Sequence, residues 1–251
     1  METLYDPLRI FLEKYEKDRR IFSFDARDLS EWESWRLGFR KKLTELIGLD
    51  FFEYSEISPK AVERKRYSAR VPEQSGFGER RTKEDIDRGS EQSSCKQLSL
   101  WALMMGTTTI GRRVWDAIRV LDYVYTRSDV DHSKIGMMGV SGGGTTTLFT
   151  SALDDRVRVV VISGYLNTFR SSILTVDHCI DNYLPGILGY GEMYDVAALI
   201  ASRPLLVESG SKDPIFPIEA TRYACEKVRR AYALLKAEDR FDTTSSRGGT
   251  R

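Results

Sequence analysis

The sequence is poor in histidine, cysteine and proline, and its charges nearly cancel. Its 251 residues include two histidines, three cysteines and seven prolines. Cys95, Cys179 and Cys225 lack the spacing of a metal site, and an odd number of cysteines makes a poor disulfide framework. We therefore expect free thiols in a reducing compartment, and we expect no metal or other cofactor.

Charge and hydropathy exclude two classes of partner. Lysine and arginine number 38 against 37 acidic residues, a net charge of +1, so neither nucleic acid nor an anionic membrane is attracted in general. No apolar run has the length of a membrane span, and the first residues lack the pattern of a signal peptide. The sequence predicts a soluble cytoplasmic protein that acts on a small molecule, and it leaves the oligomeric state open.

One stretch, residues 134–148, has a strong local pattern. A short apolar run ends in Gly139-Val140-Ser141-Gly142-Gly143, and a segment of small residues that can begin a helix follows. This order fits the Gly-x-Ser-x-Gly nucleophile elbow, in which a strained serine stands between a strand and a helix. The backbone N–H of Gly142 would then be an oxyanion donor at the positive end of that helix.

Two other interpretations of this turn stay open. It could be an ordinary connection between a strand and a helix, or a loop that binds phosphate at a helix N-terminus. The phosphate interpretation has less support, because no lysine follows the glycines and their spacing is not that of a dinucleotide site.

Strands and helices alternate along most of the chain. Apolar runs predict buried strands at residues 135–140, 158–163 and 204–208. Helical spacing of apolar residues predicts amphipathic helices at residues 113–125 and 219–235. This alternation predicts an α/β fold with a mainly parallel sheet. The sequence divides into a helical N-terminal extension (1–65), whose tryptophans we expect to dock on the main domain, and an α/β domain (66–251). An insertion at 164–201 is long enough to shape a pocket.

An active serine needs a base, and the base needs an acid to orient it. Asp213 follows the strand at 204–208 and is the candidate acid, although it could equally cap a turn before Pro214. His132 precedes the strand of the elbow, which places it at the wrong end of the sheet. His178 lies in the insertion, where it either packs or serves as a surrogate base.

The chain resembles the dienelactone-hydrolase and acetyl-xylan-esterase-like branch of the α/β-hydrolases. The resemblance rests on the Gly76-Phe77-Gly78-Glu79-Arg80 stretch, residues 111–116, the elbow, His178-Cys179 with residues 182–186, and residues 208–217. It implies a three-layer α/β-hydrolase sandwich and ester hydrolysis through an acyl-enzyme, with Ser141 as nucleophile and Asp213 as acid.

The sequence departs from this family in two places. The early strands and the His-Gly oxyanion loop have no counterpart before Gly76, so we expect an incomplete sheet that lacks about four strands. Thr250 stands where the family has the histidine of a Gly-Gly-His segment. A shift of reading frame after Asp242 is one hypothesis for this loss, and the coding DNA would test it.

These observations support two functions of different classes. The first is a serine esterase that acts on small acyl or lactone esters without a cofactor. The second is an inactive remnant that at most binds a ligand or partner.

Overall fold

The computed structural model describes residues 7–17, 19–53, 70–89 and 93–248 of the chain. The α-helices are α1 (Pro7–Lys17), α2 (Leu29–Ile47), α3 (Lys83–Asp87), α4 (Cys95–Met104), α5 (Thr109–Tyr125), α6 (Gly142–Leu153), α7 (Met193–Ala198) and α8 (Ile218–Leu234). The strands are β1 (Gly136–Val140), β2 (Val159–Ser163), β3 (Leu205–Gly210) and β4 (Phe241–Ser246). Short 3-10 helices are η1 (Leu49–Phe51), η2 (Gly78–Arg80), η3 (His132–Lys134), η4 (Ile180–Asn182), η5 (Ile187–Gly189) and η6 (Glu238–Arg240). No helix among these residues is long and apolar enough to cross a membrane.

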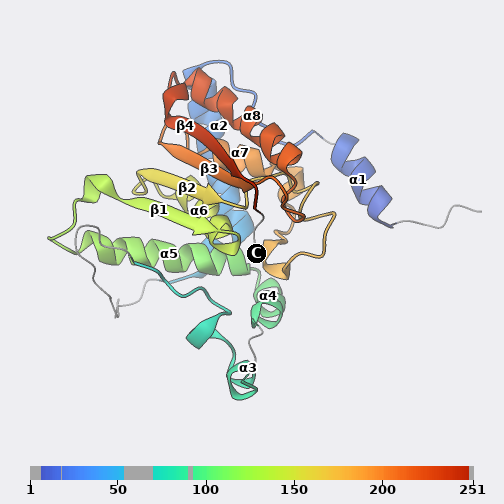
Figure 1. Ribbon diagram of the computed structural model, residues 1–251, viewed down its shortest axis with the longest axis vertical. Coiled ribbons are helices and arrows are strands. Elements are labelled where there is room, and N and C mark those ends of the chain that lie inside the picture. The colour runs from blue at the N-terminus through green and yellow to red at the C-terminus, as the bar shows by residue number, and fades with distance from the viewer. Residues whose placement is uncertain (1–6, 18, 54–69, 90–92, 249–251) are drawn as a thin grey trace, which may run out of the picture.

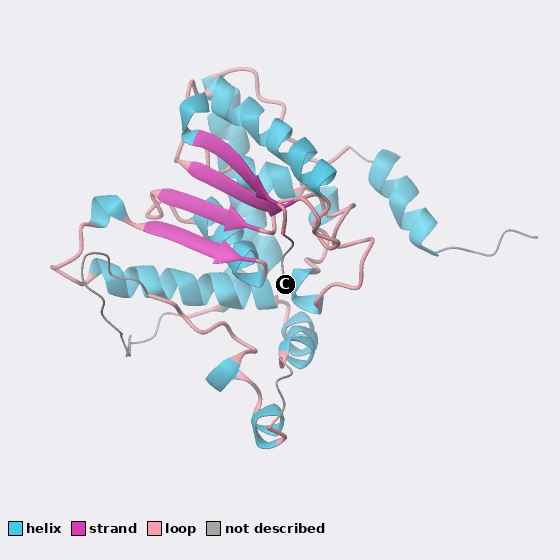
Figure 2. Ribbon diagram, in the orientation of Figure 1, coloured by secondary structure: helices cyan, strands magenta, loops and turns pink. Residues whose placement is uncertain are grey.

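The four strands form one parallel sheet whose spatial order is the chain order, β1-β2-β3-β4. Figures 1 and 2 show all four arrows pointing the same way. Each connection contains a helix, α6, α7 or α8 in turn. Right-handed crossovers that always advance in one direction place their helices on one face of the sheet. The predicted α/β class with a parallel sheet is confirmed.

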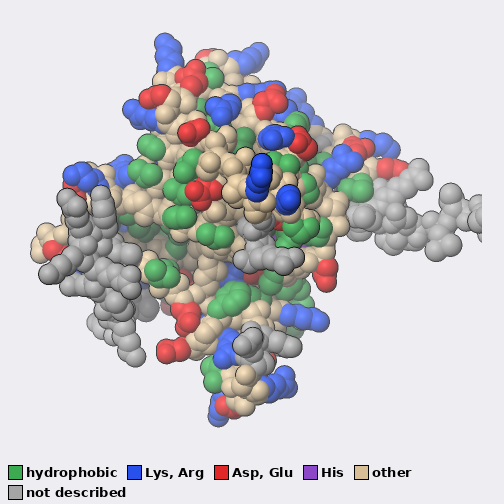
Figure 3. All heavy atoms as spheres, in the orientation of Figure 1, with side chains coloured by type: hydrophobic (Ala, Val, Ile, Leu, Met, Phe, Trp, Pro, Cys, Tyr) green, Lys and Arg blue, Asp and Glu red, His purple; other side chains and the backbone are tan. Residues whose placement is uncertain are grey.

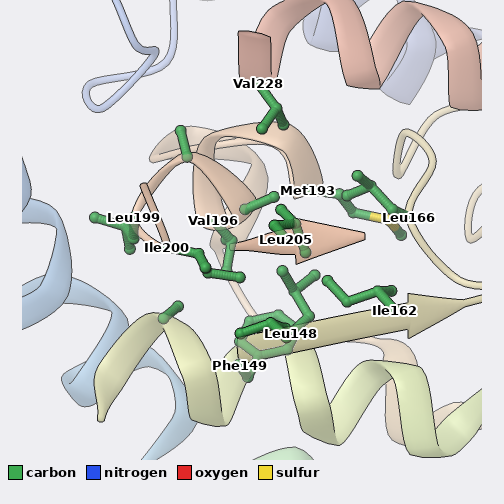
Figure 4. Close-up of a cluster of buried hydrophobic side chains, with 14 of the residues drawn as sticks. Leu148, Phe149, Ile162, Leu166, Met193, Val196, Leu199, Ile200, Leu205 and Val228 are labelled. Atoms are coloured by element: carbon green, nitrogen blue, oxygen red, sulfur yellow. The ribbon is translucent and has the colours of Figure 1, made fainter. Parts of the chain in front are cut away.

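The core lies between that face and the helices. Val160 and Ile162 of β2 and Val207 of β3 are at most 1% exposed, which follows from the alternation of side chains along a strand. Figure 4 shows part of this core, which α6, β2, α7, β3 and α8 all supply: Leu148, Phe149, Ile162, Leu166, Met193, Val196, Leu199, Ile200, Leu205 and Val228.

The opposite face of the sheet remains open. Met138, Val140 and Val159 alternate with the buried positions and are 62%, 53% and 47% exposed. Figure 3 shows hydrophobic side chains among mixed charges on the side where Figure 1 shows the strands. Within the described residues the sandwich is therefore incomplete, as the sequence predicts, with helices packed on one face only.

The helix α2 packs on the main core through its aromatic and aliphatic side. Trp32, Phe39 and Leu43 are buried in the same cluster as the sheet residues. Asp28 caps the N-terminus of the helix, because its side chain accepts a hydrogen bond from the N–H of Glu31. Gly48, with a φ of 68°, caps the C-terminus. Residues 54–69 lie outside the described part, so the division at residue 65 stays a prediction.

The strand β4 is the element that hydrophobic patterning misses. Its sequence Phe-Asp-Thr-Thr-Ser-Ser has one apolar residue, and only Phe241 is buried. Pairing with β3, from Leu205↔Phe241 to Gly210↔Ser246, forms the strand through backbone hydrogen bonds. An edge strand needs little apolar surface, so its side chains give no signal.

Candidate active site

Ser141 occupies a strained turn between β1 and α6. Its φ is 52° and its ψ is −118°, a region that a residue with a side chain rarely adopts and that costs on the order of 1–3 kcal/mol. Two hydrogen bonds hold the turn: the N–H of Ser141 donates to the carbonyl of Ser163 at 2.9 Å, and its carbonyl accepts from the N–H of Thr145 at 3.0 Å. The serine is exposed at the carboxyl end of β1.

The close approach of two backbone segments explains the first glycine of the pattern. A Cβ atom on Gly139 would lie 2.1 Å from the carbonyl oxygen of Gly143, which no rearrangement of a side chain could relieve. Gly142, by contrast, has no heavy atom within 4 Å of its virtual Cβ. The turn therefore needs glycine at 139. At 142 a side chain would have room, so the candidate site depends only on the backbone N–H of that residue.

Gly142 begins α6, where the first N–H groups have no partner within the helix. Next to it, the side-chain amide of Gln74 donates to the hydroxyl of Thr146 at 3.2 Å and lies 3.5 Å from the carbonyl of Gly142. Gln74 comes from a loop far upstream. Nothing in the local sequence pattern indicates that it meets the first turn of α6, and sequence reasoning missed it.

Asp213 lies on the loop after β3 and is only 6% exposed. Because β1 and β3 are parallel members of one sheet, this loop and Ser141 lie at the same end of the sheet. One oxygen of Asp213 accepts hydrogen bonds from the N–H groups of Ile215 at 2.9 Å and Phe216 at 3.1 Å. The carboxylate caps the turn before α8, as one interpretation of the sequence expects, and its position also suits an acid.

The two histidines lie in different places. His132 belongs to η3 before β1, stacks on Tyr125 with ring centroids 4.5 Å apart, and lies at the end of the sheet opposite Ser141. His178 lies in the insertion, where its Nε2 is 3.0 Å from the hydroxyl of Ser172 and its ring packs edge-on against Phe216 at 5.3 Å. Burial is the main cause that lowers the pKa of His178. Within the described residues, the Ser141 hydroxyl has no hydrogen bond to either ring.

Two of the stretches that carry the family resemblance contact each other and residues next to the others. Arg113 forms a buried ion pair with Asp181, with side chains 3% and 6% exposed. Its guanidinium also donates to the carbonyl of Ser75 at 3.1 Å. In the neighbouring pair, Arg80 lies 2.6 Å from Asp116. These two ion pairs therefore join the upstream loop, α5 and the insertion.

The insertion also reaches the helix of the elbow. The hydroxyl of Thr145, on the first turn of α6, donates to the side-chain oxygen of Asn182 at 3.2 Å. Residues of the insertion line a cavity of about 270 Å³ together with Leu103, and a second cavity of about 430 Å³ lies between β1 and α5. Ser141 lines neither cavity, so a pocket beside the serine stays a prediction.

Comparison with solved structures identifies the fold. A Bacteroides fragilis protein described as a "putative acetyl xylan esterase" superposes with a TM-score of 0.73 at 13% identity, over 97% of this chain and 82% of that one. Methylesterase BT1017 superposes with a TM-score of 0.61 at 17% identity, over 90% of this chain and 62% of the other. This chain has the α/β-hydrolase fold. At such identities the structural likeness concerns the fold alone.

Sequence comparison points to the same branch of the α/β-hydrolases. Residues 103–194, which include the elbow and most of the insertion, match the family "Acetyl xylan esterase (AXE1)". The "Putative hydrolase YtaP" of Bacillus subtilis (strain 168) is 30% identical over 179 residues, which make up 69% of this chain. The resemblance to the acetyl-xylan-esterase-like branch is confirmed. The chain spans 56% of the length of that Bacillus relative.

Proposed function

We propose that this protein is a serine esterase of the carboxylesterase type that acts on small acyl or lactone esters. Ser141 is the nucleophile, the backbone N–H of Gly142 is an oxyanion donor, and Asp213 is the orienting acid. The observation that carries the proposal is the strained turn at Ser141, which presents an exposed hydroxyl at the start of α6. The names of the relatives, acetyl xylan esterase and methylesterase, denote ester hydrolysis and support the same reaction class.

The reaction needs no cofactor. The Ser141 oxygen attacks the ester carbonyl, the carbonyl oxygen becomes an oxyanion, and expulsion of the alcohol leaves an acyl-enzyme that water hydrolyses. The N-terminus of α6 lowers the energy of the oxyanion, because helix N–H groups and the helix dipole both favour negative charge there. The serine proton must pass to a base in the first step and return to the alcohol that leaves.

Neither histidine in the described residues is placed to act as the base. His132 is at the opposite end of the sheet, and the Nε2 atom of His178 faces Ser172. A serine without a base stays protonated near neutral pH, so we expect the chain to hydrolyse an activated acetyl ester little faster than an unrelated protein. This geometry also favours the second candidate function, an inactive remnant that binds a ligand or partner.

Rescue by imidazole distinguishes the two candidates. Free imidazole can enter an exposed site and accept the serine proton, so it should raise the rate of p-nitrophenyl acetate hydrolysis by this chain above the rate with imidazole alone. Ser141→Ala should abolish that increment, and Asp213→Asn should reduce it. Ser133→Ala changes an exposed serine at the other end of the sheet and is the matched control. An increment that survives Ser141→Ala would leave only the non-catalytic function.

A further inference from the structure

The fold brings together two cysteines that are remote in the sequence. Cys95 is the first residue of α4 and is buried, whereas Cys179 directly precedes η4 and is exposed. Their sulfur atoms and an oxygen of Asp181 all lie within 4.8 Å of one another, and both thiols are free. Cys225, on α8, is buried elsewhere.

The two sulfur atoms have different surroundings. The guanidinium of Arg113 donates to the sulfur of Cys95 at 3.0 Å while it pairs with Asp181. The hydrogen bond from Cys179 is the main cause that lowers the pKa of Cys95 to about 6, and Arg113 adds to this effect against the opposing effect of burial. Cys95 also lies at the N-terminus of α4, a position that lowers the pKa of a thiol. These contacts favour the thiolate at Cys95 over the thiolate at Cys179.

The same three groups are a poor metal site. Structural zinc sites are almost always closed by four ligands, and here the described residues offer three. The guanidinium of Arg113 already donates to two of them, Cys95 and Asp181, so a cation would have to enter beside a fixed positive charge. Two cysteine sulfurs this close together, one of them favoured as a thiolate, are instead the arrangement from which a disulfide forms.

We propose that Cys95 and Cys179 are a redox pair that closes to a disulfide when the protein meets a low-molecular-weight disulfide such as oxidised glutathione. The exposed Cys179 passes its proton to the hydrogen-bonded Cys95 sulfur and attacks one sulfur of glutathione disulfide. This step leaves a mixed disulfide and releases one glutathione thiolate, which takes the proton from Cys95. The Cys95 thiolate then attacks the sulfur of Cys179 and releases the second glutathione. Two cysteine sulfurs are oxidised and one glutathione disulfide is reduced. One released glutathione carries the proton of Cys179, and the other takes a proton from solvent.

The bond would fasten the insertion to α4. Disulfide sulfurs are about 2.05 Å apart, so closure needs rotation of the two side chains and a small shift of the exposed segment at Cys179. The segment already contacts α6 through Asn182 and Thr145. The disulfide would close the segment between Cys95 and Cys179 into a long loop, which constrains the unfolded chain. It should therefore raise the melting temperature of the oxidised chain by about 5 °C or more. The proposal does not depend on esterase activity.

The test uses the full chain in glutathione buffers of increasing oxidised fraction. Free thiols are trapped by alkylation, and the protein is analysed by intact mass and peptide mapping. We expect loss of two hydrogens and a peptide that links Cys95 to Cys179, with a higher melting temperature that reverses on reduction. Cys225→Ser should behave like the unchanged protein. Cys179→Ser, which alters an exposed side chain and should fold normally by circular dichroism, should lose both the link and the shift in melting.

Three results would overturn the proposal. The first is that both thiols remain open to alkylation in fully oxidised glutathione. The second is a linked peptide that contains Cys225. The third is one-to-one binding of zinc by the reduced chain that Cys179→Ser abolishes, because the group would then be a metal site.

Discussion

His178 is the residue whose role is easiest to test directly. Its ring contacts Ser172 and Phe216, and both contacts belong to packing of the insertion. We predict that His178→Ala lowers the free energy of unfolding by about 1–2 kcal/mol, the size of one hydrogen bond and one aromatic contact. Any residual esterase rate should stay nearly unchanged. Thermal melts and a p-nitrophenyl acetate assay measure the two effects.

The control for this prediction is His132→Ala, which removes a ring stacked on Tyr125 at the other end of the sheet. It should also cost stability without any effect on rate. A collapse of activity in His178→Ala with an unchanged melting temperature would assign the base role to His178.

Asp195 is a second residue with a measurable property of its own. It is 1% exposed, and its two oxygens accept hydrogen bonds from the N–H groups of Phe24 at 2.8 Å and Glu192 at 2.9 Å. Burial is the main cause that raises its pKa to about 7, the charge of Glu192 adds to the rise, and Arg20 opposes it. The folded state therefore binds the Asp195 proton more tightly than the unfolded state does.

From this we predict how stability depends on pH. The contribution of Asp195 is fully present below the ordinary aspartate pKa near 4 and is lost as the pH rises to about 7, by at most about 1.4 kcal/mol per pH unit. Asp195→Asn should flatten the pH dependence of urea unfolding over this interval, although the pKa of the buried Glu192 is also raised and leaves part of the slope. An unchanged slope in the variant would show that Asp195 is charged throughout.

The elbow is the element where a single methyl group should matter most. The Cβ of Gly139→Ala would meet the backbone oxygen of Gly143 at 2.1 Å, so β1 and α6 would have to separate. We predict a loss of about 1–3 kcal/mol or more in the free energy of unfolding. Chemical denaturation followed by circular dichroism measures the change.

The matched control lies three residues away. Gly142→Ala places a methyl group in open space and keeps the N–H that we propose as oxyanion donor. It should leave stability within about 0.5 kcal/mol of the unchanged protein. Equal destabilisation by both variants would mean that the close approach at Gly139 is not what fixes the turn.

At the scale of the whole molecule, the open face of the sheet should govern association. Met138, Val140 and Val159 are about half exposed on adjacent strands, and apolar surface of this kind promotes contact between molecules. We predict that the chain elutes as larger species as its concentration rises in size-exclusion chromatography. Met138→Gln with Val140→Thr should shift the elution towards the monomer.

Ile21→Thr serves as the control, because Ile21 is 69% exposed but lies outside the sheet. It should change the elution little. A chain that stays monomeric at every concentration, or one that responds equally to Ile21→Thr, would contradict a role for the sheet face.

Several parts of the protein could be predicted from the local order of residues along the chain. The apolar runs before Ser141 and Asp213 predict β1 and β3, and the glycines around the serine predict the turn between β1 and α6. These features are local because a strand is marked by an apolar run of five or six residues, and because a strained turn needs its glycines within a few residues. The parallel sheet follows from the alternation of strands and helices.

The remaining contacts depend on how remote parts of the chain meet in the folded protein. The tertiary structure brought Gln74 to the first turn of α6, paired Arg113 with Asp181, and placed Cys95 beside Cys179. It also formed β4 from polar residues, because the unpaired edge of β3 supplied backbone partners. In each case the partners are remote in the sequence and interact through polar atoms. Such interactions leave no periodic pattern along the chain, since distance and direction in the folded protein alone decide whether two polar groups meet.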